Sequence, residues 1–418
     1  MFFSFWPHRD EFSSTRKDLF ADLAAGFTVA IVALPLAIGF GITSGMSAAS
    51  GLTTAIIAGF LAAVFGGSKY QVSGPTGAMT VILIPVVHSF GIAAIPALGI
   101  MAGILVVLMA IFKLGAVINR VPWAVIEGFT VGIALIIALQ QIPLALGIAK
   151  GAGEKSFIVA WNTLRNALNS GLIYSSLFIV AITLFIKFSY PPISKKIGIS
   201  YHIPASFVAL VLVSILTKLF SINVATIGTI PRGIGSLQTI EFANLSSLLI
   251  PAIWIALLVA VESLLSARVA DGMSHEKTHF EPNRELFGQG LATVMASVFG
   301  GMPATGAIAR TSVNVRSHAK SRLASVFHAG VLLVIALIAA PMVSQIPTAV
   351  IAGLLLGTSY RILNPVSIIE ALRTTMSEAS VLIVTAISTV AIDLIWGMTI
   401  GIALHFLLER IKVRTWKA

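Results

Sequence analysis

The chain has 418 residues, of which 57% are hydrophobic and only 10% are charged, and its mean hydropathy is +0.98. A soluble domain carries about 25% charged residues, so this composition excludes a soluble globular protein and indicates a chain surrounded by lipid. The absence of cysteine excludes disulfides, thiolate nucleophiles and cysteine-bound metals. The net charge of +11 is typical of basic loops that orient a membrane protein, so it does not require a nucleic-acid partner.

The N-terminal segment 1–22 is polar and lacks the short apolar core of a signal peptide, so we expect it to be cytoplasmic. Apolar runs of membrane length then lie at 23–42, 50–67, 94–113, 122–146, 171–188, 203–222, 250–270, 322–342, 378–392 and 394–410. Shorter apolar runs lie at 76–90, 286–300, 307–316 and 346–358. This pattern predicts an all-α polytopic membrane protein with fourteen transmembrane segments and a short cytoplasmic tail, 411–418.

The distribution of basic residues predicts the orientation of the chain. If the N-terminus is cytoplasmic, the outer loops include 43–49, 91–93, 301–306 and 343–345, none of which contains Lys or Arg. Most of the 27 basic residues, Lys187 among them, then fall in inner loops or in the tail. By the positive-inside rule, we expect a multi-pass protein of the inner (plasma) membrane with both termini in the cytoplasm.

The sequence also contains an internal repeat. Residues 61–67 resemble residues 295–301, and Thr76–Gly77–Ala78 matches Thr305–Gly306–Ala307 at nearly the same offset. Each half then holds seven segments, and an odd number inserts the second half in the opposite sense. This 7+7 inverted repeat is typical of secondary transporters, which bind substrate near the midplane where interrupted helices of the two halves meet.

Two repeat-related segments, 73–78 and 303–310, carry the Gly, Pro and Thr residues that interrupt a helix and start another. We therefore expect short extended stretches in mid-membrane, each followed by a half-helix. Two half-helix N-termini that face each other have free N–H groups and partial positive charge, which predicts an anion site. Arg310 adds a full charge one turn into the second half-helix; the alternative is that its side chain extends to an interface.

Carboxylates in apolar surroundings are candidates for a coupling role. Glu262 lies deep in the run 250–270 and, on a helix, shares a face with Ser266. Three roles stay open for Glu262: it carries a proton, it binds sodium, or it neutralises Arg310. Glu127 and Asp393 lie nearer the predicted interfaces, which favours structural roles.

The run from His275 to His279 fits the H-E-x-x-H signature of zinc metalloproteases. That chemistry requires both histidines on one face of a stable helix, together with a third ligand. Here the motif lies in a predicted loop between Gly272 and Pro282, which argues against a zinc site. We expect neither a metal nor an organic cofactor, and no enzymatic activity.

Several longer motifs resemble the SulP family, which comprises sulfate permeases, cyanobacterial bicarbonate transporters and the animal anion exchangers related to prestin. The resemblance covers roughly residues 18–410. The motifs that carry it are 25–30 with Leu34–Pro35, 64–67 before 74–77, Pro122 with 128–130, 283–290, and 300–307 with 309–311.

The resemblance implies a core domain, 23–113 and 250–342, that moves against a gate domain, 122–222 and 346–410, in an elevator-like motion. Carried over position by position, the substrate site of the family falls on Phe40, Thr76, Gly77, Ala78, Gly306, Ala307, Ile308, Ala309 and Arg310. The coupling-ion site falls on Glu262 and Ser266.

The chain departs from the family pattern in four places. Most members carry a C-terminal STAS domain, whereas this sequence ends at Ala418, so we expect no STAS domain; a homodimer stays open. Leu36 replaces a usual Gln. Sodium-coupled bicarbonate transporters carry Asp and Thr where Glu262 and Ile308 stand, which weakens the case for sodium. They also lack an Arg at the position of Arg310, which favours the sulfate-permease type.

These observations together predict secondary active transport of a small inorganic anion, sulfate or bicarbonate, coupled to H⁺ or Na⁺. Two alternatives remain. A uracil- or xanthine-type permease has the same fold, but such sites use carboxylates to bind the base, whereas this site looks cationic. An uncoupled anion channel is the other alternative.

Overall fold

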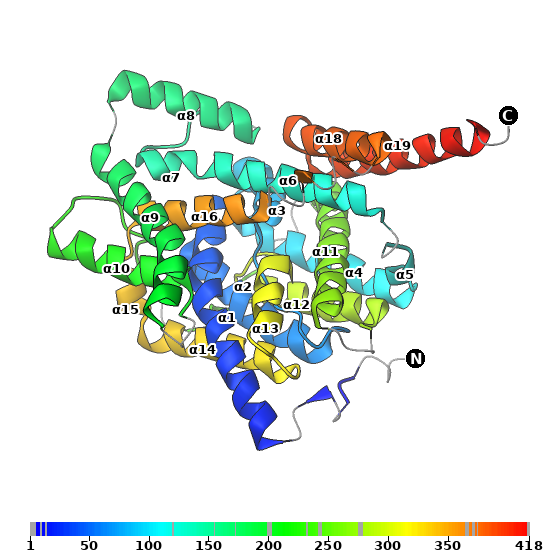
Figure 1. Ribbon diagram of the computed structural model, residues 1–418, viewed down its shortest axis with the longest axis horizontal. Coiled ribbons are helices and arrows are strands. Elements are labelled where there is room, and N and C mark those ends of the chain that lie inside the picture. Colours follow the sequence, from blue (N-terminus) through cyan, green and yellow to red (C-terminus); the bar gives the residue numbers. More distant parts are fainter. Residues whose placement is uncertain are drawn as a thin grey trace.

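The computed structural model describes residues 6–8, 11–12, 15–118, 121–153, 155–171, 173–198, 203–230, 233–240, 245–274, 279–363, 368–369, 373 and 375–415. Most of them are helical (Figure 1). The first half contains α1 (Arg16–Thr43), α2 (Ala48–Phe65), α3 (Gly77–Phe90), α4 (Ile95–Ile111), α5 (Gly115–Ile118), α6 (Trp123–Gln140), α7 (Ile142–Leu146), α8 (Ser156–Ser170), α9 (Tyr174–Ile197) and α10 (Ala205–Leu219). The second contains α11 (Leu245–Ser274), α12 (Pro282–Val298), α13 (Ile308–Arg316), α14 (Leu323–Ile338), α15 (Ala340–Val343), α16 (Thr348–Leu363), α18 (Met376–Ala391) and α19 (Leu394–Thr415). Two strands, β1 (Ser73–Gly74) and β2 (Thr305–Gly306), form the only sheet within these residues.

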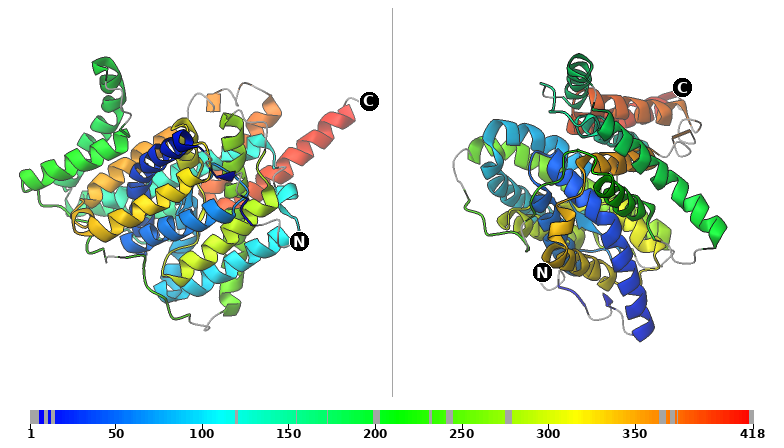
Figure 2. Two further views of the ribbon diagram at one scale, coloured as in Figure 1. Left: turned by 90° about the horizontal axis from the view of Figure 1, so that it is seen from below. Right: turned by 90° about the vertical axis from the view of Figure 1, so that its left-hand side faces the viewer.

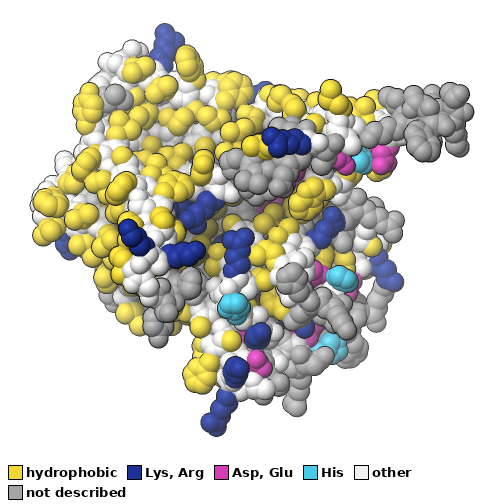
Figure 3. All heavy atoms as spheres, viewed as in Figure 1, with side chains coloured by type: hydrophobic (Ala, Val, Ile, Leu, Met, Phe, Trp, Pro, Cys, Tyr) yellow, Lys and Arg dark blue, Asp and Glu magenta, His cyan; other side chains and the backbone are white. Residues whose placement is uncertain are grey.

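Each apolar run in the sequence coincides with a helix or with two consecutive helices. Among the described residues, six helical stretches are long and apolar enough to span a membrane: 16–43, 48–65, 92–111, 123–146, 174–197 and 245–274. Hydrophobic side chains are exposed over much of the face seen in Figure 3, as contact with lipid requires. The chain is therefore a polytopic helical membrane protein, while the number of fourteen crossings stays a prediction.

Two helices extend beyond the predicted apolar runs, and a third helix lies outside all of these runs. The first helix begins at Arg16, before the run 23–42, because the Thr15 side chain accepts a hydrogen bond from the Asp18 N–H and caps the helix. The helix α9 runs past residue 188, so Lys187 does not lie in an inner loop: it is buried and donates to the Leu354 carbonyl. The connection after α7 contains α8, whose mixed composition hides it from a search for apolar runs.

The helices pack in two groups. In the first group, α12 packs on α4 and α2, and α1 packs on α14 and α2, while α11 contacts α4 and α13. In the second group, α6 packs on α18 and α16, and α9 packs on α16 and α10. The terminal helix α19 packs on α18 and then extends away from the other helices (Figure 1, Figure 2). The division of the chain into a core domain and a gate domain, and the roles of the two domains, stay predictions.

Candidate functional site

The two extended segments predicted from the repeat pair with each other. β1 and β2 run antiparallel, with Ser73 opposite Gly306 and Gly74 opposite Thr305. The Ala307 N–H also donates to the Val72 carbonyl over 3.0 Å. This pairing satisfies backbone groups that would otherwise be costly to bury inside a membrane. Because the strands are antiparallel, α3 and α13 leave the crossing in opposite directions, and the N-terminus of each helix lies at the crossing.

Neither half-helix is capped at its N-terminus by a side chain. Thr76 precedes α3 in extended conformation, but its hydroxyl donates to Glu262 Oε2 over 3.0 Å instead of capping the helix. Ala307 precedes α13 and has no side-chain oxygen that could cap it. The N–H groups of both first turns, together with the positive ends of both helix dipoles, are therefore available to an anion.

Through Glu262 and its neighbour Ser263, the helix α11 holds β2 and the residues on either side of β1. The Gly306 N–H donates to Ser263 Oγ over 3.0 Å, and Gln71 Nε2 donates to the Ser263 carbonyl over 2.9 Å. Thr305 adds side-chain hydrogen bonds to this helix. Glu262 therefore touches the first residue before α3 and lies beside the strand that leads into α13.

Arg310 lies beneath the crossing. Its side chain is 1% exposed, and its Nη2 donates to the Pro75 carbonyl over 3.0 Å. The alternative that Arg310 extends to an interface is therefore wrong. Gly74 leaves room for it: a Cβ at this position would lie 2.7 Å from Arg310 Nη1, and the φ of +154° also favours glycine. Nη1 has no acceptor among the described residues.

Phe40 and a helix of the second group cover the N-terminus of α3. A Cβ at Gly77 would lie 3.2 Å from Phe40 Cε1 and 2.3 Å from Ile137 Cδ1 of α6. One turn further along α6, Gln140 Oε1 accepts a hydrogen bond from Thr80 over 2.8 Å. The structure thus places Phe40 beside Gly77, and its role in binding stays a prediction. It also adds Ile137 and Gln140, which no motif in the sequence singled out.

The remaining predicted positions occupy different surroundings. Ala78 is fully buried in the first turn of α3, whereas Ile308 is partly exposed and Ala309 is exposed in the first turn of α13. Ser266 lies one turn from Glu262, but its hydroxyl donates to Thr311 Oγ1 over 3.0 Å. Ser266 therefore helps to hold α13 in place.

The structure describes two of the other candidates, Glu127 and Asp393, and only part of the third. Glu127 is partly exposed on α6. Asp393 precedes α19, and its carboxylate accepts a hydrogen bond from the Trp396 N–H over 2.8 Å, as expected of a structural cap. Most of the H-E-x-x-H motif, residues 275–278, lies outside the described residues; His279 lies 3.5 Å from Asp271.

The close approach of Gly77 to Ile137 leads to a prediction. Gly77→Ala is expected to reduce transport roughly tenfold, because the new Cβ overpacks the contact between α3 and α6. Alanine is favourable in a helix, so the fold is expected to persist. The Gly77→Ala/Ile137→Ala pair makes room for the Cβ and is expected to recover transport, measured as initial uptake rates in liposomes. Wild-type rates in the single variant, or a pair no faster than Gly77→Ala, would contradict this contact.

Comparison with known proteins identifies relatives along nearly the whole chain. The model of the sulfate permease family matches residues 19–387. YvdB of Bacillus subtilis, whose name marks it provisionally as a sulfate transporter, is 36% identical over 92% of this chain and 72% of its own length. The bicarbonate transporter BicA of Picosynechococcus is 32% identical over 92% of this chain and 69% of its own.

A solved structure has the same fold. The transmembrane domain of a cyanobacterial bicarbonate transporter BicA aligns with a TM-score of 0.81 at 32% identity, and the alignment covers 92% of this chain and 98% of that domain. The crossing of two extended segments therefore lies in a fold shared with a transporter of a small anion. The chain belongs to the sulfate permease family and is a multi-pass membrane anion transporter.

Proposed function

We propose that this chain is a secondary active transporter of sulfate or bicarbonate, and that the anion binds between the N-termini of α3 and α13. The observation that carries the proposal is the β1–β2 crossing, which directs two uncapped helix N-termini to one place above the buried Arg310. Backbone N–H groups at such ends bind anions without a dedicated basic side chain in contact. A site of this kind binds moderately, as a transporter that must release its cargo requires.

Movement of the anion requires that the site open alternately to the two sides. We propose that the core (23–113 and 250–342) slides against the gate (122–222 and 346–410) and carries the site with it. The contacts of α3 with Ile137 and Gln140 of α6 lie between these groups and would break and re-form in each cycle. The BicA relationship supports a transport function of this fold.

Coupling is assigned to Glu262. This carboxylate accepts from Thr76 at the start of α3 and lies in the electrostatic field of Arg310, so its charge and that of the anion act on the same helix ends. An H⁺ or Na⁺ bound at Glu262 would offset its negative charge and favour anion binding. Glu262 would then couple the anion to the cation.

The test is uptake into liposomes that contain the purified chain. Radiolabelled sulfate and bicarbonate are supplied in separate experiments, each with and without an inward gradient of H⁺ or Na⁺. The proposal expects accumulation of one of the two anions above equilibrium with one of the cation gradients. Uptake of uracil or xanthine in place of both anions would favour the permease alternative, and a reversal potential set by the anion gradient alone would favour a channel.

A further inference from the structure

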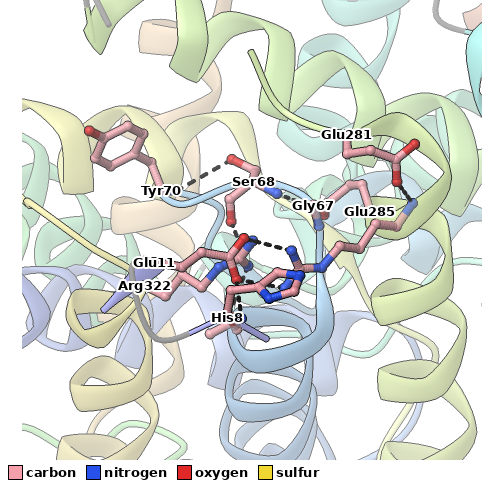
Figure 4. Close-up of polar contacts among 10 residues, drawn as sticks. His8, Glu11, Gly67, Ser68, Tyr70, Glu281, Glu285 and Arg322 are labelled. Atoms are coloured by element: carbon pink, nitrogen blue, oxygen red, sulfur yellow. Dashed lines mark hydrogen bonds and ion pairs between the residues drawn. The ribbon is translucent and has the colours of Figure 1, made fainter. Parts of the chain in front are cut away.

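Two arginines, Arg284 and Arg322, converge on the carboxylate of Glu11 near the N-terminus. Figure 4 shows Glu11 and Arg322 at this place. Arg284, in the first turn of α12, donates from Nη1 to Glu11 Oε1 over 2.6 Å and from Nη2 to Glu11 Oε2 over 2.7 Å. Arg322, which precedes α14, donates from Nη2 to Glu11 Oε1 over 3.1 Å. The arginine side chains are 7% and 1% exposed, so both guanidinium groups are nearly removed from solvent. This bidentate geometry is the one that Arg adopts with carboxylates and with phosphate or sulfate groups.

Contacts other than Glu11 hold Arg322 in place. Its Nη1 donates to the Ala63 carbonyl in the last turn of α2 and to the Ser68 carbonyl in the loop that follows, each over 3.2 Å. Glu285 also holds this loop, because its Oε2 accepts from the N–H groups of Gly67 and Ser68 over 2.8 and 2.9 Å. Since these bonds do not involve Glu11, Arg322 is held in a position to bind an anion whether or not Glu11 is present.

The hydrogen-bond donors that the pair leaves unpaired point to a ligand with more oxygens than a carboxylate. The Nε atoms of Arg284 and Arg322 are buried and have no acceptor among the described residues. Buried guanidinium donors without partners are costly, and Glu11 offers only two oxygens, both already used by the Nη groups. A tetrahedral oxyanion has four oxygens and suits two guanidinium groups that approach from different helices.

The charges around Arg284 and Arg322 also favour binding of an anion in place of Glu11. Burial raises the pKa of Glu11, but the hydrogen bond from Arg284 and the charge of Arg322 outweigh burial and lower this pKa to about 2. Glu11 is therefore ionised at neutral pH, and its stabilising contact is lost only as the pH falls from about 4.5 towards 2. Without Glu11, the two arginines and Glu285 leave a net positive charge in a nearly buried place.

The carboxylate comes from a short segment outside the helices. Apart from Glu11, the described part of this segment meets the core through the edge-on contact of Trp6 with Phe65, at a ring-centroid distance of 5.7 Å. The Arg322 N–H also donates to the Glu11 carbonyl, over a long 3.4 Å. By contrast, Asp22 in α1 accepts two backbone N–H groups and a hydroxyl of the loop before α14. Among the described residues 6–8, 11–12 and 15, displacement therefore breaks few contacts beyond those of Glu11 itself.

We propose that Arg284 and Arg322 form a second oxyanion site, which Glu11 fills in this structure and which a sulfate or phosphate group fills when the N-terminal segment is displaced. The ligand is a free oxyanion or the phosphate of an anionic lipid, because both present the same group to the arginines. The site is separate from the crossing of β1 and β2 and does not depend on the proposed transport function. Its occupant decides whether the segment before α1 stays docked on α2, α12 and α14.

The first test is thermal unfolding of the full chain in neutral detergent, with sulfate or phosphate titrated against chloride at constant ionic strength. Glu11→Gln is expected to lower the unfolding midpoint by roughly 5 °C, because the arginines lose their anion. Sulfate or phosphate is expected to restore most of this loss in Glu11→Gln but to raise the wild-type midpoint much less. Sulfate or phosphate bound at the transport site raises the unfolding midpoints of Glu11→Gln and the wild type alike. The difference between the two proteins therefore reports the second site. Glu409→Gln, which removes an exposed carboxylate of α19, is the matched control and is expected to behave like the wild type.

Arg284→Met in the Glu11→Gln background is expected to abolish the restoration by sulfate or phosphate. Restoration that persists in this double variant, or an equal response of Glu11→Gln and the wild type, would overturn the site.

A second measurement on the wild type needs no variant and separates the two ligand sources. Amide hydrogen exchange at residues 11 and 12 is followed in nanodiscs of phosphatidylcholine, with and without added phosphate, and in nanodiscs that contain phosphatidylglycerol. Faster exchange with free phosphate identifies a free oxyanion as the ligand, and faster exchange with phosphatidylglycerol alone identifies a lipid phosphate. Exchange that is unchanged in both arms would overturn the proposal.

Discussion

Arg310→Ala is expected to lower anion uptake at low anion concentration by roughly tenfold to a hundredfold. The guanidinium group is buried beneath the crossing and is held at the Pro75 carbonyl, so its removal takes away a positive charge and a charged hydrogen bond at once. A hydrogen bond to a charged group contributes about 1.5–3 kcal/mol, and each 1.4 kcal/mol is about a factor of ten. Initial uptake rates over a range of anion concentrations measure the effect, which should appear mainly in KM.

Arg316→Ala is the matched control for this change. Arg316 lies at the other end of the same helix α13, where it is exposed, and its loss removes the same charge from the same element. We expect near wild-type uptake for Arg316→Ala. Arg310→Lys keeps the charge but loses the planar guanidinium group, so its KM should lie between those of the wild type and Arg310→Ala. A KM between these two values separates the loss of charge from a folding defect. Equal KM values for Arg310→Ala and Arg316→Ala in folded protein would remove Arg310 from the anion site.

Glu262→Gln is expected to abolish accumulation of the anion against its gradient, while exchange of anion for anion continues. The amide can still accept the hydrogen bond from Thr76, so the start of α3 keeps its partner. It cannot take up a proton, and it gives a sodium ion no negative charge. The accumulation ratio in liposomes with an imposed H⁺ or Na⁺ gradient should therefore fall to the value without a gradient.

Glu127→Gln provides the comparison for this loss of charge, because Glu127 lies in the first turns of α6, whereas Ile137 and Gln140, which contact α3, lie near its other end. Its accumulation ratio is expected to stay at the wild-type level. If Glu262→Gln accumulates the anion as well as the wild type does, with the same pH and sodium dependence, the coupling cation binds elsewhere and Glu262 only balances the charge of Arg310.

The crossing could be expected from the sequence because its signals are local. Gly and Pro close together disfavour a continuous helix, and the same pattern occurs twice at a nearly constant offset, in residues 73–78 and 303–310. The sequence predicts two extended segments but not that they pair as strands. The structure supplies both the pairing and its register.

Other parts of the site depend on contacts that a single sequence does not encode in a motif. Ile137 and Gln140 lie in an apolar run with nothing to distinguish them, and they reach the site only because α6 packs against α3. No motif distinguishes Ser263 beside Glu262, although its hydroxyl accepts the hydrogen bond from Gly306 of β2. The contacts of Glu11 with Arg284 and Arg322, which are distant in the sequence, likewise arise from packing. A polar segment before the first helix does not indicate which residues it will contact.

The absence of native cysteine permits a direct test of where the anion binds. Ala309→Cys places a unique thiol in the exposed first turn of α13, and Ser380→Cys places one on an exposed position of α18. The rate of modification by a water-soluble methanethiosulfonate reagent is measured against the concentration of the transported anion. Binding between α3 and α13 predicts that the anion slows modification of Ala309→Cys near its KM for uptake and leaves Ser380→Cys unchanged. Uptake by Ala309→Cys without any protection of its thiol would contradict an anion site at this crossing.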